Sequence, residues 1–133
     1  MKILIAEDDF VSRKILNTQL TPLGKVDCAA NGNEVFIAVK MAFEENQPYD
    51  LICLDIMMPE VDGIMALKKI RQLEAQKGLS PETRSKIIMI TALSDKNHVM
   101  AAAQANCDGF LVKPIEKKRL LDEIRKHGFD IPE

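Results

Sequence analysis

The sequence predicts a doubly wound α/β domain, a (βα)5 arrangement around a five-stranded parallel sheet. Short apolar runs of strand length alternate with longer stretches whose apolar residues recur at helical spacing. Five such pairs follow one another within 133 residues, the length of one domain. This alternation requires helices on both faces of the sheet and right-handed crossovers, and 2-1-3-4-5 is the common strand order of the small versions. We therefore expect a single domain over residues 1–133.

The first two strand–helix pairs lie in the first third of the chain. The run Lys2–Ala6 is apolar between charged residues, which is typical of a buried strand, and Lys25–Ala29 is a shorter strand candidate. Between them, apolar residues recur four apart and predict a helix that ends near Pro22. The pairs are Val11 with Ile15 and Leu16 with Leu20. Asn31, with Glu34 three residues later, predicts the start of the second helix.

Two strongly apolar strand candidates occupy the middle of the chain. Asp50–Asp55 ends on a single acid, and Lys86–Ala92 is apolar at almost every position, as expected of a strand covered on both faces. Asp62 can cap a helix between them, and the polar stretch Lys77–Ser85 predicts a loop after that helix. The helix carries three apolar residues on one face: Ile64, Leu67 and Ile70.

The last strand candidate lies between two further helices. A helix is expected to begin at residues 94–95, and Gly109–Lys113 is a strand that Pro114 ends. The final helix has Leu120 and Ile124 on one face. These elements complete the five strand–helix pairs.

Composition and charge exclude several classes of protein. Hydrophobic residues make up 47% and charged residues 29% of the chain, and the net charge of −2 argues against direct nucleic-acid binding. No apolar stretch reaches membrane-spanning length, and the N-terminus turns acidic too early for a signal peptide. We therefore expect no membrane association and a cytoplasmic location. The odd number of cysteines predicts reduced core thiols: Cys28, Cys53 and Cys107.

Acidic residues follow two strands that the predicted order makes neighbours. Glu7 and Asp8 come after the first strand, and Asp55 ends the third. Parallel strands lie about 4.8 Å apart, so these side chains should converge at the carboxyl edge of the sheet, where such folds bind ligands. Two carboxylates 4 Å apart repel by about 4 kcal/mol at an effective dielectric near 20, so the cluster needs a cation. Donor sets made only of oxygen favour Mg²⁺.

A hydroxyl and an ammonium are expected at the same edge. Thr91 ends the fourth strand, and Lys113 ends the fifth. A carboxylate, a metal, a hydroxyl donor and a positive charge together are typical of phosphoryl transfer, in which positioning and charge neutralisation do most of the catalysis. Aspartate can accept a phosphoryl group covalently. We therefore expect Asp55 to be the acceptor.

Four motifs follow the predicted strands in order: "AEDD" at 6–9, "LDIMMPEVDG" at 54–63, "TA" at 91–92 and "LVKP" at 111–114. With them the chain resembles the receiver domain of response regulators in two-component signalling, over essentially its whole length. The resemblance implies a flavodoxin-like, or CheY-like, fold. It also implies a switch that catalyses its own phosphorylation and dephosphorylation, and not an enzyme that turns over a small-molecule substrate.

The resemblance implies roles for the acids. Asp55 would be the phospho-acceptor, and Asp8 would bind Mg²⁺ directly. Glu7 would act largely through metal-bound water, and the backbone carbonyl of Met57 would be a further ligand. Mn²⁺ could replace Mg²⁺. For Asp9 we prefer the alternative that it caps the first helix.

Further roles follow for the last two strands. Thr91, followed by Ala92, would hydrogen-bond the phosphoryl group and move toward it. Lys113 would pair with a phosphoryl oxygen or, before phosphorylation, with the acceptor carboxylate, and its bond to Pro114 would be cis. Phe110 matches the aromatic switch position, although a plain core role is the safer interpretation.

Partners follow from the resemblance as well. The donor would be a phosphohistidine on a sensor histidine kinase or a histidine phosphotransfer protein, and a downstream effector or output domain would read the switch. Phosphorylation adds about −1.5 to −2 charge and would remodel the face made by the fourth helix, the fifth strand and the fifth helix. That face could also form a phosphorylation-linked homodimer. Gln76–Ser85 is longer than usual for the family and could contact a partner, and the chain could be a stand-alone receiver or a piece of a larger protein.

Met57 and Leu93 occupy the two positions that flank the path of the hydrolytic water in this family. Neither side chain can orient or deprotonate water, so we expect slow autodephosphorylation. Met57 also argues against the alternative of an aspartate-nucleophile phosphatase, which usually has a second Asp there as general acid. A receiver-like module that never carries phosphate is the other alternative. Such modules typically lose an acid, the acceptor or the lysine, whereas this chain keeps all of them.

Overall fold

Five parallel strands form one sheet in the order β2-β1-β3-β4-β5. The strands are β1 (Lys2–Ala6), β2 (Lys25–Ala29), β3 (Leu51–Asp55), β4 (Lys86–Thr91) and β5 (Gly109–Val112). The helices are α1 (Phe10–Leu20), α2 (Gly32–Glu44), α3 (Gly63–Gln76), α4 (Lys96–Gln104) and α5 (Lys117–Lys126), with a 3-10 turn, η1, at Thr21–Leu23. The structure, a computed structural model, describes residues 1–58, 62–92 and 96–131. It confirms the doubly wound α/β fold and the strand order that the sequence predicts.

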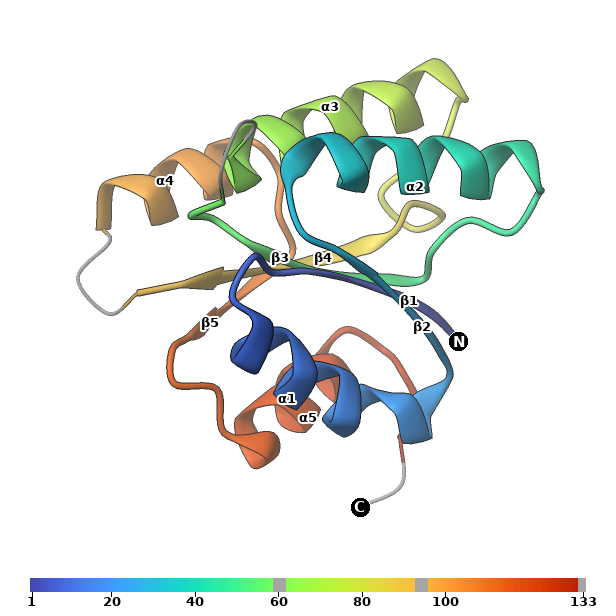
Figure 1. The fold of residues 1–133 in the computed structure, drawn as a ribbon. Helices are drawn as coiled ribbons and strands as arrows, with labels where there is room; N and C mark the ends of the chain where they lie inside the picture. The colour runs from blue at the N-terminus through green and yellow to red at the C-terminus, as the bar shows by residue number, and fades with distance from the viewer. Residues whose placement is uncertain (59–61, 93–95, 132–133) are drawn as a thin grey trace.

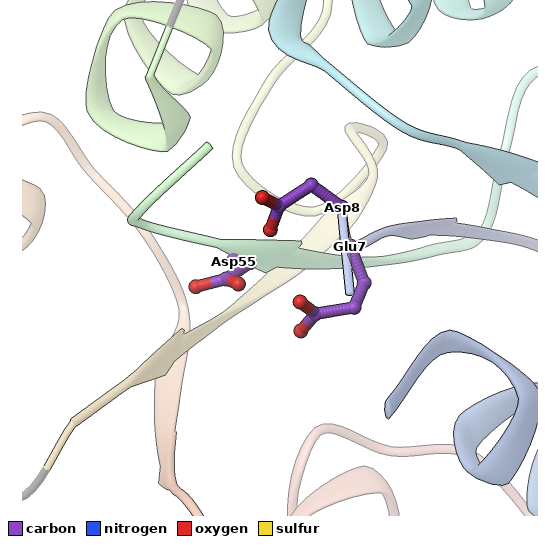
Figure 2. A group of neighbouring side chains, drawn as sticks. All are labelled: Glu7, Asp8 and Asp55. Carbon is purple, nitrogen blue, oxygen red and sulfur yellow. The ribbon is translucent and has the colours of Figure 1, made fainter. Parts of the chain in front are cut away.

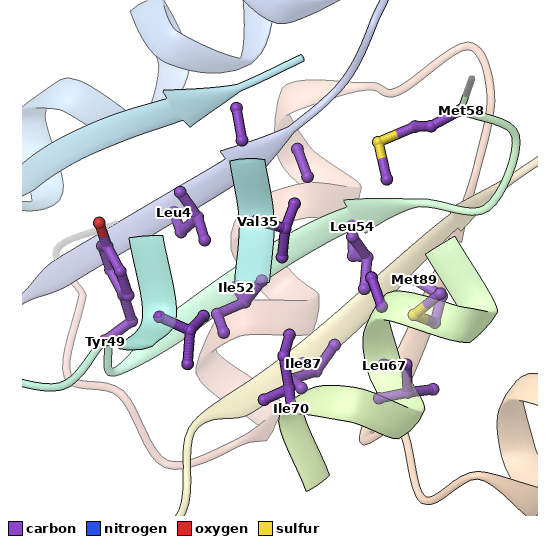
Figure 3. Close-up of a cluster of buried hydrophobic side chains, with 14 of the residues drawn as sticks. Leu4, Val35, Tyr49, Ile52, Leu54, Met58, Leu67, Ile70, Ile87 and Met89 are labelled. Atoms are coloured by element: carbon purple, nitrogen blue, oxygen red, sulfur yellow. The ribbon is translucent and has the colours of Figure 1, made fainter. Parts of the chain in front are cut away.

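The sheet separates two hydrophobic cores. Helices α1 and α5 cover one face, and α2, α3 and α4 cover the other (Figure 1). Because side chains alternate along a strand, Ile3 and Ile5 face the α1–α5 side while Leu4 and Ala6 face the other side. Figure 3 shows the larger cluster, in which residues of β1, β3 and β4 pack against α2 and α3. Strands buried on both faces account for the continuous apolar runs in the sequence.

Three helices begin at the predicted caps. The side-chain oxygens of Asp9, Asn31 and Asp62 each accept a hydrogen bond from the backbone N–H three residues later, at 2.8–2.9 Å. Asp9 is therefore a helix cap, as its position suggested. The predicted start at residues 94–95 lies outside the described residues, and α4 is described from Lys96.

Two details of burial differ from the expectations. In α1, Leu16 and Leu20 are buried but Val11 and Ile15 are exposed. Positions five apart on a helix differ by about 140°, so the two apolar pairs lie on different faces and only one faces the sheet. Cys28 is exposed on the edge strand β2, so the prediction of a core thiol is wrong there, whereas Cys53 is buried. No helix among the described residues is long and apolar enough to cross a membrane.

The polar loop after α3 is anchored by a partly buried charge network. Arg71 Nη1 contacts Glu74 Oε1, and Arg71 Nη2 contacts Asp108 Oδ2, both at 2.7 Å. Glu74 Oε2 accepts a hydrogen bond from Ser85 N at 2.9 Å, and Asp108 Oδ2 accepts one from Ile87 N at 2.7 Å. The network joins α3, the end of the loop and the segment before β5, at the edge of the sheet opposite the acids.

Gly63, the first residue of α3, lies against the end of β3. Its N–H donates to Ile56 O at 2.9 Å, and a Cβ at this position would overlap the carbonyl oxygen of Asp55. This close approach holds the start of α3 against the backbone at the end of β3, where the Asp55 carboxylate lies.

Replacing Gly63 with Ala should therefore destabilise the domain by about 1–3 kcal/mol, because the added methyl group meets backbone that cannot move aside. Alanine normally favours a helix by about 1 kcal/mol over glycine, so the sign of the effect is diagnostic. Urea unfolding measures it, with Lys68→Ala at an exposed position of the same helix as control. Equal or greater stability of Gly63→Ala would contradict the contact.

Candidate functional site

Strand register brings the sequence-predicted site residues to one edge of the sheet. Ala6 of β1 pairs with Leu54 of β3, so the next residues, Glu7 and Asp55, lie at the same level. Asp55 in turn pairs with Ile90 of β4, one residue before the end of that strand. The carboxyl edge of the sheet therefore carries residues from three adjacent strands.

The three acids form a cluster. Glu7, Asp8 and Asp55 each offer a carboxylate oxygen, and these oxygens lie within 4.8 Å of one another. Figure 2 shows the three side chains converging from the ends of β1 and β3. Glu7 is 0% exposed and Asp55 3% exposed, whereas Asp8 is exposed to solvent. The predicted convergence of the acids is thus present in the structure, with two of them buried.

The ammonium of Lys113 lies between the two buried acids. Lys113 Nζ is 2.9 Å from Asp55 Oδ2 and 3.0 Å from Glu7 Oε2. Partial burial acts to lower the pKa of Lys113, but its contacts with Asp55 and Glu7 outweigh this effect and raise the pKa. Lys113 therefore stays charged and offsets part of the cost of burying two carboxylates.

Glu7 is the acid most perturbed by its surroundings. Burial and, to a smaller extent, the neighbouring Asp55 raise the pKa of its carboxyl group to about 7, although Lys113 acts in the opposite direction. Glu7 Oε1 accepts a hydrogen bond from Asp9 N at 3.1 Å. Oε2 is buried and faces Lys113 as an ion pair, without accepting a well-directed hydrogen bond from any described residue. A buried carboxylate oxygen with spare capacity, within a set of oxygen donors only, fits a small hard cation such as Mg²⁺.

The Asp55 carboxylate is held from both sides. Asp55 Oδ1 accepts a hydrogen bond from Met57 N at 3.1 Å, and Oδ2 accepts one from Lys113 Nζ. The Met57 side chain is 60% exposed and follows Asp55 by two residues. These contacts fix the orientation of Asp55 at the end of β3.

The remaining predicted residues lie in or next to β4 and β5. Thr91 is buried, and its hydroxyl donates to Ala92 O at 3.2 Å. Phe110 is half-buried and packs against the core on the α2–α4 side of the sheet. The Lys113–Pro114 peptide is cis, as predicted. Leu93 lies outside the described residues.

One contact in the site was not found from the sequence. The guanidinium of Arg13 donates from Nη1 to the backbone carbonyl of Glu7 at 2.9 Å. Every residue has a backbone carbonyl, so the sequence does not indicate which carbonyl an arginine near the start of a helix will contact. The contact becomes visible only when α1 is placed against the end of β1.

Comparison with known proteins identifies the family. The chain matches the response regulator receiver domain over residues 3–125. It belongs to the response regulator receiver family. This receiver domain is 38% identical over 127 residues to the chemotaxis protein CheY of Bacillus subtilis, covering 94% of this chain and 95% of CheY. It is also 31% identical over 122 residues to the osmosensing histidine protein kinase SLN1 of Saccharomyces cerevisiae, covering 90% of this chain but 9% of the kinase.

Solved receiver structures share the fold. The CheX–CheY complex of Borrelia burgdorferi with BeF₃ and Mg²⁺ matches with a TM-score of 0.81 and 27% identity, over 98% of this chain and 90% of that chain. The receiver domain of the Arabidopsis thaliana histidine kinase CKI1, with Mg²⁺ and BeF₃⁻, matches with a TM-score of 0.79 and 28% identity. The match covers 95% of this chain and 88% of that chain. Receiver domains of two-component and phosphorelay systems bind Mg²⁺ at an acidic site and interact with histidine kinases or phosphotransfer proteins and with effectors.

The perturbed pKa of Glu7 predicts a pH-dependent stability in the metal-free protein. The pKa is raised from 4.5 to about 7, so between these values the folded protein keeps a proton that the unfolded chain has lost. The free energy of unfolding of the wild type therefore falls as pH rises through this window. Glu7→Gln cannot lose this proton, so its free energy of unfolding relative to the wild type should grow from about pH 5 to about pH 7 and then level off.

Urea unfolding of both proteins in EDTA, at several pH values, measures this difference. Glu44→Gln, which removes a negative charge from an exposed position, is the control and should show no such trend. A difference between Glu7→Gln and the wild type that stays constant across the window would contradict the assignment of the raised pKa to Glu7.

Proposed function

We propose that this receiver domain, residues 1–133, is a phosphorylatable switch that accepts a phosphoryl group on Asp55 from a phosphohistidine. The observation that carries the proposal is the position of the Asp55 carboxylate, 2.9 Å from Lys113 Nζ and in one cluster with Glu7 and Asp8. A carboxylate oxygen forms the new P–O bond while the P–N bond to the donor imidazole breaks. The imidazole nitrogen keeps the electron pair of that bond and takes up a proton.

The acidic cluster is the proposed metal site. Asp8 and Asp55 would bind Mg²⁺ directly, Glu7 would act largely through metal-bound water, and the backbone carbonyl of Met57 would complete the protein donors. When bound, the ion supplies neutralisation of negative charge on the acids and the phosphoryl oxygens. The same oxygen donors would also accept Mn²⁺.

The chain's own groups stabilise the transferred phosphoryl group. Lys113 exchanges its contact with the Asp55 carboxylate for one with a phosphoryl oxygen. The Thr91 hydroxyl leaves the Ala92 carbonyl and donates to another phosphoryl oxygen. As Thr91 moves toward the site, Phe110 turns into the space that it leaves. The α4–β5–α5 face then changes shape, because α4 follows β4 and Phe110 belongs to β5.

The proposed partners follow from this chemistry. A sensor histidine kinase or a histidine phosphotransfer protein supplies the phosphoryl group, and a downstream effector or output domain reads the α4–β5–α5 face. The same face would support a phosphorylation-linked homodimer. The match to part of the much longer SLN1 kinase is consistent with a phosphorelay partner.

Incubation with Mg²⁺ and acetyl phosphate should add one phosphoryl group to the protein, measured by intact mass. Asp55→Asn should gain none, because the nucleophilic carboxylate is lost, and prior EDTA treatment should prevent the adduct in the wild type. Asp62→Asn is the matched control, since it removes an acid near β3 but keeps a side chain that can cap α3. Equal labelling of Asp55→Asn and the wild type would contradict the proposal.

Loss of the phosphoryl group should be slow in the wild type. The thioether of Met57 cannot activate water, and Leu93 at the second position cannot either. Replacing them with Asn and Glu should accelerate the loss at least about tenfold, because each new side chain can orient or deprotonate the attacking water. The decay of the intact-mass adduct measures the rate, with Met57→Leu as an apolar control. An unchanged rate in the double variant would rule out this explanation.

A further inference from the structure

Arg13 makes a side-chain contact with the main chain of the acidic cluster. It lies in the second turn of α1, and its Nη1 donates to the carbonyl oxygen of Glu7 at 2.9 Å. The guanidinium also lies 5.7 Å from the ring centroid of Phe10. Because β1 ends at Ala6, the Glu7 carbonyl lies beyond the strand, and Arg13 supplies a hydrogen bond to it there.

The segment that carries the acids is held at both ends. Glu7 N donates to Ala29 O at 3.1 Å, which extends the β1–β2 pairing by one residue. Asp9 N donates to Glu7 Oε1, and Asp9 caps α1 through Ser12. The peptide unit between Glu7 and Asp8 lies in the middle of this segment, and Arg13 binds the carbonyl group of that unit.

The placement of Asp8 depends on that peptide unit. Asp8 is exposed, and no described residue donates a hydrogen bond to its carboxylate or forms an ion pair with it. Its side chain nevertheless converges on Asp55 (Figure 2). The backbone sets the direction of the Asp8 Cα–Cβ bond and restricts its rotamers, so a contact that fixes the Glu7–Asp8 peptide also limits the positions that the Asp8 carboxylate can reach.

We infer that Arg13 is a positioning residue for the metal site. Its guanidinium fixes the Glu7–Asp8 peptide and thereby sets the affinity of the acidic cluster for Mg²⁺. The inference rests on the proposed function. Arginine suits this task because it stays charged at every relevant pH and donates in a fixed direction. The Phe10 ring is 65% exposed, so its contact with the guanidinium adds little to the stability of the fold, but it helps to orient the guanidinium.

Mg²⁺ affinity of the full chain, measured by isothermal titration calorimetry, tests the inference. Arg13→Met removes the hydrogen bond and should raise the Kd for Mg²⁺ about tenfold, the effect typical of losing a group that orients a metal ligand. Lys14→Met is the matched control, because it removes one positive charge at the next, exposed position of α1 and should leave the Kd unchanged. Arg13→Gln, a milder change, should also weaken binding and serves if Arg13→Met does not fold.

Phosphorylation by acetyl phosphate gives a second readout. At limiting Mg²⁺ the rate for Arg13→Met should fall by the same factor as the affinity, and at saturating Mg²⁺ it should return to the wild-type value. An unchanged Kd in a folded Arg13 variant, even one with a lower melting temperature, would overturn the inference, since Arg13 would then serve the fold alone. If the wild type neither binds Mg²⁺ nor gains a phosphoryl group, the proposed function falls and this inference with it.

Discussion

The ammonium of Lys113, held between the carboxylates of Asp55 and Glu7, is the interaction on which the site depends. Each of these acids ends or follows a buried strand, where an uncompensated charge costs several kcal/mol. Lys113 offsets that cost and at the same time connects the ends of β1, β3 and β5. The pair formed by Asp55 and Lys113 is therefore both a structural tie and the contact that phosphorylation would exchange.

Much of the fold follows from periodicity and from helix caps, because both depend on neighbours in the sequence. The acids could also be placed together, because each lies at a strand end and the expected strand order makes β1 and β3 neighbours. The face of α1 that packs on the sheet could not be predicted, because the pair Leu16 and Leu20 has the same spacing as the pair Val11 and Ile15. The contact between Arg71 and Asp108, which are 37 residues apart and lie away from the predicted site, was not predicted either. The Arg13 contact was not predicted because its acceptor is a main-chain carbonyl, which every residue has.

The two strands beyond Asp55 join the acid edge of the sheet to the core on the α2–α4 side. Thr91 pairs with Val112, and Met89 pairs with Phe110, so the hydroxyl and the aromatic ring belong to one strand pair. Thr91 is buried and Phe110 is half-buried. On the α2–α4 side the ring packs with a core that includes Ala102 of α4. Strand β5 thus connects Lys113 at the acid edge with the Phe110 ring and the core beneath α4.

The strand order also has a consequence for the nascent chain. Glu7 and Asp55 come from strands that can pair before Lys113 has been synthesised, because Lys113 follows 58 residues after Asp55. Until β5 joins the sheet, the two acids lie side by side without their cation, and the β4 edge is open. Without Lys113, protonation of one acid or a bound cation must relieve their repulsion, so the first four strands alone lack part of the native charge balance. The last strand completes the sheet and the charge balance in a single step, which favours folding of the domain as one unit.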